Sequence, residues 1–256
     1  MPYITVADCS IFYEDIGIGE PILFLHSGYS RGIIAFCGQI QPFFHTYRCL
    51  LPDFRGHGRT TSDSKDWDTP IIAEDMAGFL QALGISKAHL IGYSLGGGVA
   101  LHLAAKHPEL VKSIITIGCG GEADPTGSEA YEPEALIQSH QEAVIERIKS
   151  LHYDAHGGDW QHHMRMSVRD WRLYPSLSSG DWAKLTMPML LIGGENDTFA
   201  SLEKLAAMQR KCAQAEVFSV PGGSHRPHMP TEQVQAVNQR MLDFLQKAYE
   251  PPRIHN

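Results

Sequence analysis

A chain of 256 residues can bury one large hydrophobic core or two small ones. Its content of 43% hydrophobic and 20% charged residues is typical of a globular protein and excludes a disordered or fibrous one. The net charge of -8 argues against nucleic acid or an anionic membrane as the partner, because both would repel the protein, so a small molecule is expected instead.

The first 120 residues alternate predicted strands with predicted helices. Thr69 is expected to cap a helix that carries Pro70 in its first turn and Gly84 just after its last turn. A second helix is expected after a glycine-rich turn and ends before Pro108. The pattern predicts strands at residues 3–6, 10–15, 22–25, 48–51, 88–91 and 111–117, and helices at 71–83 and 98–106.

The alternation stops between residues 121 and 186, where no strand is predicted. Helical runs at 134–151 and 159–171 indicate an all-helical insertion, which we expect to lie as a cap over the ends of the sheet.

Strands and helices alternate again after the insertion. The pattern predicts strands at 189–192 and 216–220 and helices at 202–211 and 231–248. The whole sequence therefore predicts an α/β fold, with a mostly parallel central sheet and helices on both faces. We expect a core domain of residues 1–120 and 187–256 and a helical cap of residues 121–186.

One short segment carries the strongest chemical signal. Gly92-Tyr93-Ser94-Leu95-Gly96 fits the pattern G-x-S-x-G and stands between a predicted strand and a predicted helix. A sharp, strained turn there would lift the Ser94 hydroxyl above the sheet, and the flanking glycines would let the backbone turn tightly. The helix N-terminus would direct N–H groups toward the reaction centre. Ser94 is therefore predicted to be a nucleophile.

A serine nucleophile needs a base. His225 follows the predicted strand 216–220 in a glycine-bearing loop, where it can reach over a neighbouring strand end. His228, three residues further on, is the alternative. We predict that His225 is the base.

The base in turn needs a carboxylate to orient it. Asp197 follows the predicted strand 189–192 and gives the chain order serine, acid, histidine. It would accept the Nδ1–H of His225 and stabilise the imidazolium that forms during the reaction. The alternatives are Glu195, Glu122 and Asp124.

Two backbone N–H groups are expected to form an oxyanion hole. Leu95 follows the nucleophile and supplies one of them, and the loop after strand 22–25 supplies the other. Gly28 is the predicted second donor, with Tyr29 as the alternative.

Aromatic and methionine side chains are frequent in the predicted cap. Most are expected to form the cap's own core, because amphipathic helices bury such residues. A few would line an apolar substrate pocket beneath it. The predicted substrate contacts are Tyr29, Tyr93, Trp160 and Met164. Arginines of the cap would favour an anionic lactone unless they form surface ion pairs; they are Arg165, Arg169 and Arg172.

Taken together, several segments resemble the α/β-hydrolase superfamily, in particular its small capped esterases and lactonases. They are Leu25-His26-Ser27-Gly28, Asp53-Phe54-Arg55-Gly56-His57-Gly58, the segment around Ser94, Gly194-Glu195-Asn196-Asp197 and Gly223-Ser224-His225. The resemblance implies that Ser94, Asp197 and His225 form a catalytic triad and that the loop around His57 is a structural turn. The chain departs from the family at Ser27 and Ser224, where glycine is usual. A serine nucleophile disfavours the epoxide hydrolase and dehalogenase branches, which use a carboxylate.

The expected function is hydrolysis of a carboxylic ester or lactone of a small, partly apolar substrate through an acyl-enzyme on Ser94. The alternatives are an enol-lactone or C–C bond hydrolase, a cofactor-free perhydrolase, and a hydrolase-like receptor for a small molecule. The acyl chain length and the oligomeric state are left open by the sequence.

No metal or other cofactor is expected. His152 and His156 stand four residues apart, but Gly157-Gly158 breaks any helix, and no acidic or histidine set has metal-ligand spacing. The five cysteines lack paired spacing and predict free thiols in a reducing compartment. No signal peptide and no apolar run of membrane-spanning length is seen, so a cytoplasmic location with no membrane contact is expected.

Overall fold

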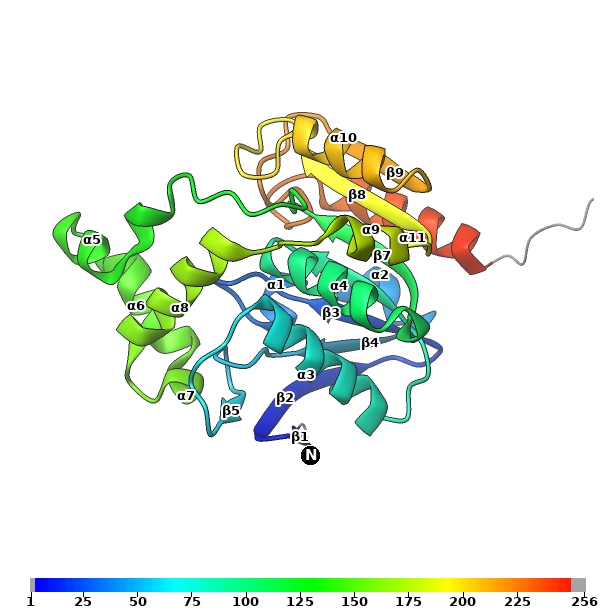
Figure 1. Cartoon of the computed structure of the whole chain (residues 1–256). Coiled ribbons are helices and arrows are strands. Elements are labelled where there is room, and N and C mark those ends of the chain that lie inside the picture. Colours follow the sequence, from blue (N-terminus) through cyan, green and yellow to red (C-terminus); the bar gives the residue numbers. More distant parts are fainter. Residues whose placement is uncertain (1–2, 250–256) are drawn as a thin grey trace, which may run out of the picture.

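The computed structural model describes residues 3–249, which form one sheet of nine strands with helices on both faces (Figure 1). The strands lie in the order β1-β2-β4-β3-β6-β7-β8-β9, and the short β5 pairs with β2. Strand β2 pairs antiparallel with its neighbours, and the remaining pairs from β4 to β9 are parallel. The predicted fold class is therefore confirmed. Residues 1–2 and 250–256 of the predicted core domain lie outside the described residues.

The strands agree closely with the predicted ones. Only β5, a two-residue strand, has no counterpart among the predictions. The strands are β1 (Tyr3–Val6), β2 (Cys9–Ile16), β3 (Glu20–Leu25), β4 (Tyr47–Pro52), β5 (Thr61–Ser62), β6 (Ala88–Tyr93), β7 (Val111–Ile117), β8 (Met189–Gly194) and β9 (Ala215–Val220).

The helices differ more from the prediction. The short α1 and α2 were not predicted, and the run 134–151 is divided at His140, whose φ of 54° no helix accommodates. The helices are α1 (Gly32–Ala35), α2 (Ile40–Phe43), α3 (Thr69–Ala82), α4 (Leu95–Lys106), α5 (Pro133–Gln138), α6 (Glu142–Leu151), α7 (Tyr153–His156), α8 (Trp160–Leu173), α9 (Ser179–Lys184), α10 (Leu202–Lys211) and α11 (Val234–Tyr249), with 3₁₀ turns η1 (Pro108–Leu110) and η2 (Ser128–Tyr131).

The start of α3 corrects the sequence analysis by one residue. The cap is Asp68, whose carboxylate accepts the backbone N–H of Ile71 at 2.9 Å. Thr69 is the first residue inside the helix, so the prediction that it caps α3 is wrong. Its N–H has no partner within the helix and is available to another element.

Side chains of the central strands alternate between two cores. Leu23 and Leu25 of β3 face a cluster that includes residues of α3, α4, α9 and α10. Ile22 and Phe24 face the other cluster, which includes residues of α1, α2 and α11. This period of two is what a parallel sheet covered on both faces requires.

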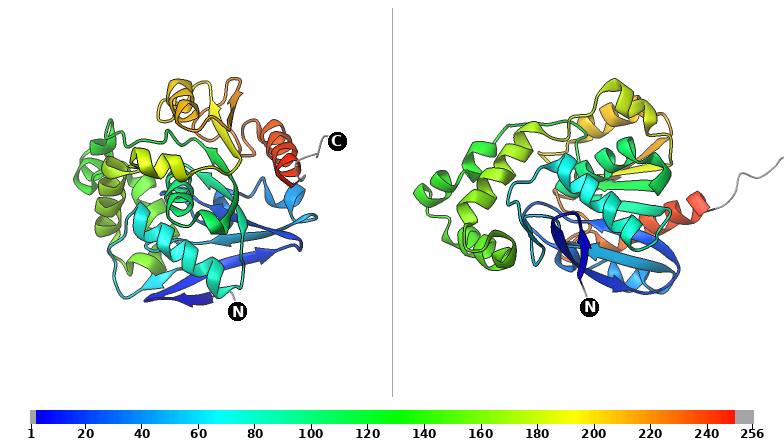
Figure 2. Two further views of the ribbon diagram at one scale, coloured as in Figure 1. Left: turned by 45° about the vertical axis from the view of Figure 1, so that its right-hand side comes forward. Right: turned by 60° about the horizontal axis from the view of Figure 1, so that its bottom comes forward.

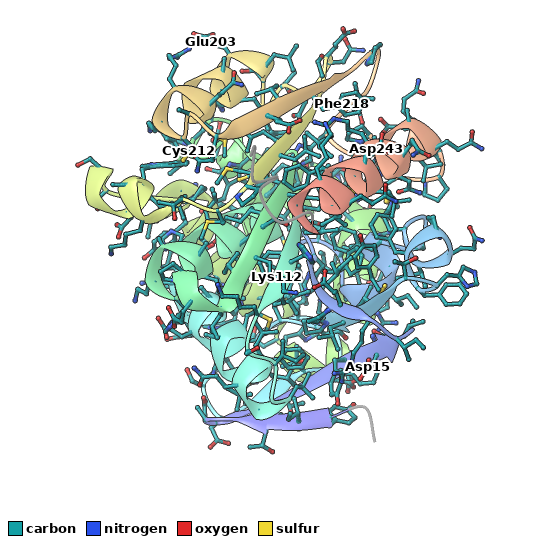
Figure 3. The ribbon with its side chains drawn as sticks, turned by 90° about the vertical axis from the view of Figure 1, so that its right-hand side faces the viewer. Asp15, Lys112, Glu203, Cys212, Phe218 and Asp243 are labelled. Carbon is teal, nitrogen blue, oxygen red and sulfur yellow. The ribbon has the colours of Figure 1, made fainter. Side chains whose placement is uncertain are left out.

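The helices α5 to α8 stand to one side of the sheet (Figures 1 and 2). They have a small core of their own, made by Leu136, Ile145, Ile148 and Met164. Helix α9 differs from them, because its Trp182 belongs to the main core cluster and the helix contacts α4. The opposite end of the molecule, seen in Figure 3, carries Lys112 at the amino end of β7.

Between residues 3 and 249, none of the helices combines the length and the apolar character needed to cross a membrane.

Candidate active site

Ser94 stands at the turn between β6 and α4, with a φ of 54° and a ψ of -115°. Such a conformation is strained for a residue with a side chain, and the surroundings must hold it. Its backbone N–H donates to Ile117 of β7 at 2.8 Å. A Cβ on Gly96 would lie 1.9 Å from the Leu25 carbonyl oxygen, and one on Gly92 would lie 2.2 Å from the Gly96 carbonyl oxygen. Both glycines are therefore required by close packing.

The structure brings Ser94, His225 and Asp197 together from three separate loops. His225 Nδ1 lies 2.9 Å from Asp197 Oδ2, and His225 Nε2 lies 3.1 Å from Ser94 Oγ. Because a carboxylate only accepts, His225 carries its proton on Nδ1 and leaves Nε2 free to accept the Ser94 hydroxyl proton. This is the arrangement in which histidine serves as a general base toward a serine.

Asp197 is buried and fully hydrogen-bonded. Its Oδ1 accepts the backbone N–H groups of Phe199 at 2.8 Å and Ala200 at 3.0 Å. Burial on its own would raise the pKa of Asp197, but the hydrogen bonds from His225 and from these N–H groups outweigh it and lower the pKa. The carboxylate is therefore charged at neutral pH and held in one orientation.

The structure places the alternative residues elsewhere. His228 is buried, and its Nε2 donates to the Ala35 carbonyl at 3.0 Å. Glu195 accepts the Gly222 N–H at 3.0 Å. The remaining two acids form ion pairs with lysines, Asp124 with Lys204 and Glu122 with Lys211.

Two aromatic rings flank the imidazole of His225. Phe199 lies with its ring centre 5.1 Å away in an edge-on arrangement, and Tyr93 lies 5.5 Å away. Tyr93 also packs on His228 at 4.5 Å, and burial raises its pKa to about 12. The imidazole thus packs against both aromatic rings.

The loop after β3 is fixed by His26. Its Nε2 accepts the Phe54 N–H at 2.9 Å, and its Nδ1 donates to the Ser27 carbonyl at the same distance. Burial holds the pKa of His26 well below its ordinary value, in keeping with a neutral ring that donates once and accepts once. The Ser27 carbonyl also accepts the Ser30 N–H at 3.1 Å. The serine that replaces the usual glycine is thereby part of an ordered turn.

Gly28 and Leu95 both line the cavity that contains Ser94. Leu95 begins α4, where N–H groups have no partner within the helix. A Cβ built on Gly28 would meet the Leu95 side chain at 3.6 Å, so the two residues are neighbours. Their role as oxyanion donors stays a prediction.

Ser94 opens into a cavity of about 770 Å³, a size typical of sites for small molecules. Two of the predicted substrate contacts, Tyr29 and Tyr93, line it. Tyr29 stacks on Tyr131 with ring centres 5.5 Å apart. The aromatic residues that line the cavity are Tyr29, Trp67, Tyr93, Tyr131, Trp171, Tyr174 and Phe199.

The structure does not bring Trp160 and Met164 to this cavity. Met164 is fully buried in the core of the α5–α8 helices, and Trp160 packs against the same cluster. The prediction that they contact the substrate is therefore wrong. Both side chains pack among the α5–α8 helices, because the apolar face of α8 lies against the neighbouring helices. Two arginines of the predicted cap also form ion pairs, Arg165 with Glu134 and Arg172 with Glu132.

Asp170 is a cavity residue that the sequence analysis did not single out. It is 4% exposed and accepts both the N–H and the hydroxyl of Thr69. Burial raises its pKa to about 7, although the hydrogen bonds from Thr69 act in the opposite direction. Asp170 is one of several charged residues in a predicted helix, and nothing in the sequence distinguishes it from the others. Phe199, by contrast, stands two residues after Asp197, and this position in the sequence could have indicated that it lies near the site.

A group of buried histidines connects the helices α6–α8 with the core. His57 lies with its ring centre 5.2 Å from His152 and 5.0 Å from His163, and these two stack at 4.6 Å. His152 accepts the Gly58 N–H at 2.9 Å, and His163 donates to the Gly56 carbonyl at 2.8 Å. Among residues 3–249, no group of three or more histidine, cysteine or acidic side chains has the geometry to hold a metal ion.

Known proteins with similar sequences and structures include several that are named as hydrolases. A family model described as alpha/beta hydrolase fold matches residues 20–231. A bifunctional esterase/perhydrolase from Acinetobacter calcoaceticus is 24% identical over 280 residues, which cover 96% of this chain and 99% of that protein. A 2-hydroxy-6-oxo-6-phenylhexa-2,4-dienoate hydrolase from Burkholderia cepacia is 27% identical over 266 residues, covering 92% and 91%. A serine hydrolase structure from Cycloclasticus zankles has a TM-score of 0.80 at 19% identity, covering 97% of this chain and 98% of that one.

Proposed function

The chain belongs to the α/β-hydrolase fold family and is a hydrolase, and from this premise we propose that it cleaves a carboxylic ester or lactone through an acyl-enzyme on Ser94. The observation that carries the proposal is the hydrogen-bonded series Ser94 Oγ, His225, Asp197, which opens into a cavity whose lining includes several aromatic rings. The substrate is small and partly apolar, because aromatic walls of this kind bind apolar groups.

The first half of the reaction forms the acyl-enzyme. Ser94 Oγ attacks the ester carbonyl carbon while its proton passes to His225 Nε2. The carbonyl oxygen becomes an oxyanion, which the N–H groups of Gly28 and Leu95 stabilise. When the tetrahedral intermediate collapses, the C–O bond to the alcohol breaks and His225 returns the proton to the leaving oxygen. Asp197 stabilises the imidazolium while it exists.

The second half releases the acid. A water molecule loses a proton to His225 Nε2 and attacks the acyl carbon. The bond to Ser94 Oγ then breaks, and that oxygen takes back the proton. For a lactone, the alcohol and the acid are parts of one product molecule, so a ring opens with the addition of one water.

We further propose that α5 to α8 serve as a cap that selects the substrate. Residues of the predicted cap, among them Tyr131, Asp170 and Trp171, line the same cavity as Ser94. The Asp170–Thr69 hydrogen bonds and the histidine group tie these helices to the core. A change in the cavity-facing residues of the cap would therefore alter substrate choice without altering Ser94.

A second candidate is cleavage of a carbon–carbon bond next to a ketone. The 27% identical relative named as a 2-hydroxy-6-oxo-6-phenylhexa-2,4-dienoate hydrolase favours it. In that reaction water adds its hydroxyl to the acyl carbon and its hydrogen to the leaving carbon. The esterase/perhydrolase relative favours a further variant, in which hydrogen peroxide replaces water and a peracid is released.

A panel of substrates separates these reactions. Purified protein is assayed with p-nitrophenyl esters of increasing chain length, with lactones, with a vinylogous 1,5-diketone and with an ester plus hydrogen peroxide. The proposal expects the highest kcat/KM with an ester or lactone. A kcat/KM at least tenfold higher for the diketone would replace it by the second candidate, and binding without turnover would favour a receptor.

The cytoplasmic location is likewise a proposal. All five cysteines lie within the described residues and are free thiols, four of them buried. Free thiols of this kind persist in a reducing compartment.

A further inference from the structure

The loop that carries His225 is anchored by a carboxylate from the segment before α11. Ser224 directly precedes His225, and its backbone N–H donates to Glu232 Oε2 at 2.9 Å. The Ser224 hydroxyl donates to Glu232 Oε1 at 2.6 Å. The carboxylate therefore binds two donors of one residue, an arrangement that fixes both its position and its orientation.

The same hydroxyl also reaches the residue after His225. The backbone N–H of Arg226 donates to Ser224 Oγ at 3.3 Å. The main chain on both sides of His225 is thus tied, directly or through one hydroxyl, to the carboxylate of Glu232. That side chain is 19% exposed, so its hydrogen bonds are shielded from competing water. Arg226 itself lies 3.8 Å from the carboxylate with a 65% exposed side chain, and such an exposed ion pair contributes little.

Close packing holds the other side of this loop. A Cβ on Gly194 would lie 2.2 Å from the carbonyl oxygens of both Gly223 and Ser224. A Cβ on Gly118 would lie 2.7 Å from the His225 carbonyl oxygen. The loop consequently rests against two glycine backbones, and Glu232 binds it at Ser224.

Ser224 is one of the two places where the chain departs from the usual family pattern. A glycine there has an N–H but no hydroxyl, so it would make only one of the two hydrogen bonds to Glu232 and would not reach Arg226. The serine and the glutamate together supply an anchor that a glycine cannot.

We propose that Glu232 is a positioning residue that acts through Ser224 to hold the His225 imidazole between Ser94 and Asp197. The proposal rests on the proposed function, in which His225 moves the proton of Ser94. A base must be held within a few tenths of an ångström of its productive place, and a shift of about 1 Å costs on the order of 100-fold in rate. Loss of the anchor therefore lowers the reactivity of Ser94 more than it lowers substrate binding.

The test compares four single variants and one double variant of the full chain. Glu232→Ala removes the anchor, and Ser224→Ala removes the hydroxyl but keeps the N–H bond. Glu232→Gln keeps both contacts without the charge, because its amide oxygen accepts the Ser224 N–H and its amide nitrogen donates to the Ser224 hydroxyl. Glu203→Gln is the matched control, since Glu203 lies exposed on α10 (Figure 3).

Three readouts are taken for each variant: the rate of fluorophosphonate labelling, the split between kcat and KM, and the NMR signal of the His225 Nδ1 proton. We expect labelling and kcat to fall about 10- to 100-fold in Glu232→Ala with KM within about twofold. Ser224→Ala is expected to fall less, Glu232→Gln to stay within about threefold of the wild type, and Glu203→Gln to be unchanged. The thermal midpoint reports whether each variant is folded.

The double variant Ser224→Ala/Glu232→Ala is expected to match Glu232→Ala, because the two residues act as one unit. Wild-type labelling and an unchanged His225 proton signal in a folded Glu232→Ala protein would overturn the positioning role. If the wild type itself fails to label, the proposed function is wrong, and the His225 signal decides the positioning role separately: a signal that moves or broadens in Glu232→Ala but not in Glu232→Gln supports it, and an unchanged signal rejects it.

Discussion

Asp170 of α8 accepts two hydrogen bonds from Thr69, the first residue of α3, although the two residues are 101 positions apart. The backbone N–H of Thr69 lies 2.6 Å and its hydroxyl 2.9 Å from the carboxylate oxygens. The pair uses the N–H that the start of α3 leaves without a partner. It thereby joins the α5–α8 helices to the core at the wall of the cavity.

The first prediction concerns the pH dependence of this pair. The pKa of Asp170 is raised in the folded protein from 3.8 to about 7, so between these values the folded state binds more protons than the unfolded one. Its contribution to stability is therefore present below about pH 4 and is lost as the pH rises toward 7, by at most about 1.4 kcal/mol per pH unit. Asp170→Asn keeps an acceptor for the Thr69 N–H and does not titrate.

Urea unfolding of wild type and Asp170→Asn at pH 5 and pH 8 measures the effect. The variant is expected to gain stability relative to the wild type on going to pH 8. A difference between the two proteins that stays constant across this range would contradict the prediction.

A second pH effect of opposite sign is expected from the histidine group. Burial is the main cause that holds the pKa of His152 well below its ordinary value of 6.5. Here the unfolded state binds the extra proton, so stability is present above about pH 6.5 and is lost as the pH falls. His152→Asn keeps an acceptor near the Gly58 N–H but does not titrate.

The variant is expected to be about 1–3 kcal/mol less stable at pH 7.5, because ring packing is lost. Its stability should nevertheless fall less steeply between pH 6.5 and 5, by at most about 1.4 kcal/mol per pH unit. His140→Asn is the control, because the His140 side chain is 85% exposed. An equal acid dependence in wild type and His152→Asn would show that this ring does not take part.

The turn at Ser94 gives a third prediction, which concerns packing. In Gly96→Ala the new methyl group would lie 1.9 Å from the Leu25 carbonyl oxygen, so β3 and α4 must move apart. We expect a loss of stability on the order of 3 kcal/mol and loss of activity in the fraction that folds. Gly180→Ala is the control, because its nearest neighbour, Ser178 Oγ, is 3.7 Å away. Equal urea midpoints for the two variants would count against this account of the turn.

The strands and the local motifs were the most predictable part of the molecule. β7 and α10 have the predicted bounds, because their apolar spacing and their flanking residues agree. Helix α4 begins at Leu95 and not at residue 98, since packing of the turn against β3 overrides the low helix propensity of three glycines. Local helix propensity carries no information about that tertiary contact.

The site was predictable where a residue's place follows from the end of a strand. Ser94, Asp197 and His225 each follow a strand of one parallel sheet, and the carboxyl ends of parallel strands meet at the same edge. The cap contacts were not predictable, because which face of α8 meets the cavity depends on how that helix packs. Met164 turned into the helical core while Asp170 turned toward Thr69, and the spacing of these residues distinguishes neither outcome. The anchor at Glu232 depends on a loop conformation that no local pattern specifies.

A fourth prediction concerns the carboxylate that orients His225. Asp197→Asn keeps the size of the side chain but cannot hold the Nδ1–H tautomer, because its amide group can donate to Nδ1. At pH 7 we expect kcat to fall about 10³- to 10⁴-fold with the fold retained. Glu195→Gln is compared in parallel, and its kcat is expected to stay near that of the wild type. If Glu195→Gln lost more activity than Asp197→Asn, the assignment of the acid would have to change.

The central claim is that Ser94 is the nucleophile, and covalent trapping tests it most directly. Wild type and Ser94→Ala are treated with a fluorophosphonate, intact masses are recorded over time, and the modified residue is located by peptide mapping. The account predicts one adduct per wild-type chain, placed on Ser94, and no adduct at that rate in Ser94→Ala. An adduct on another residue of the wild type, or equal labelling of Ser94→Ala, would contradict it.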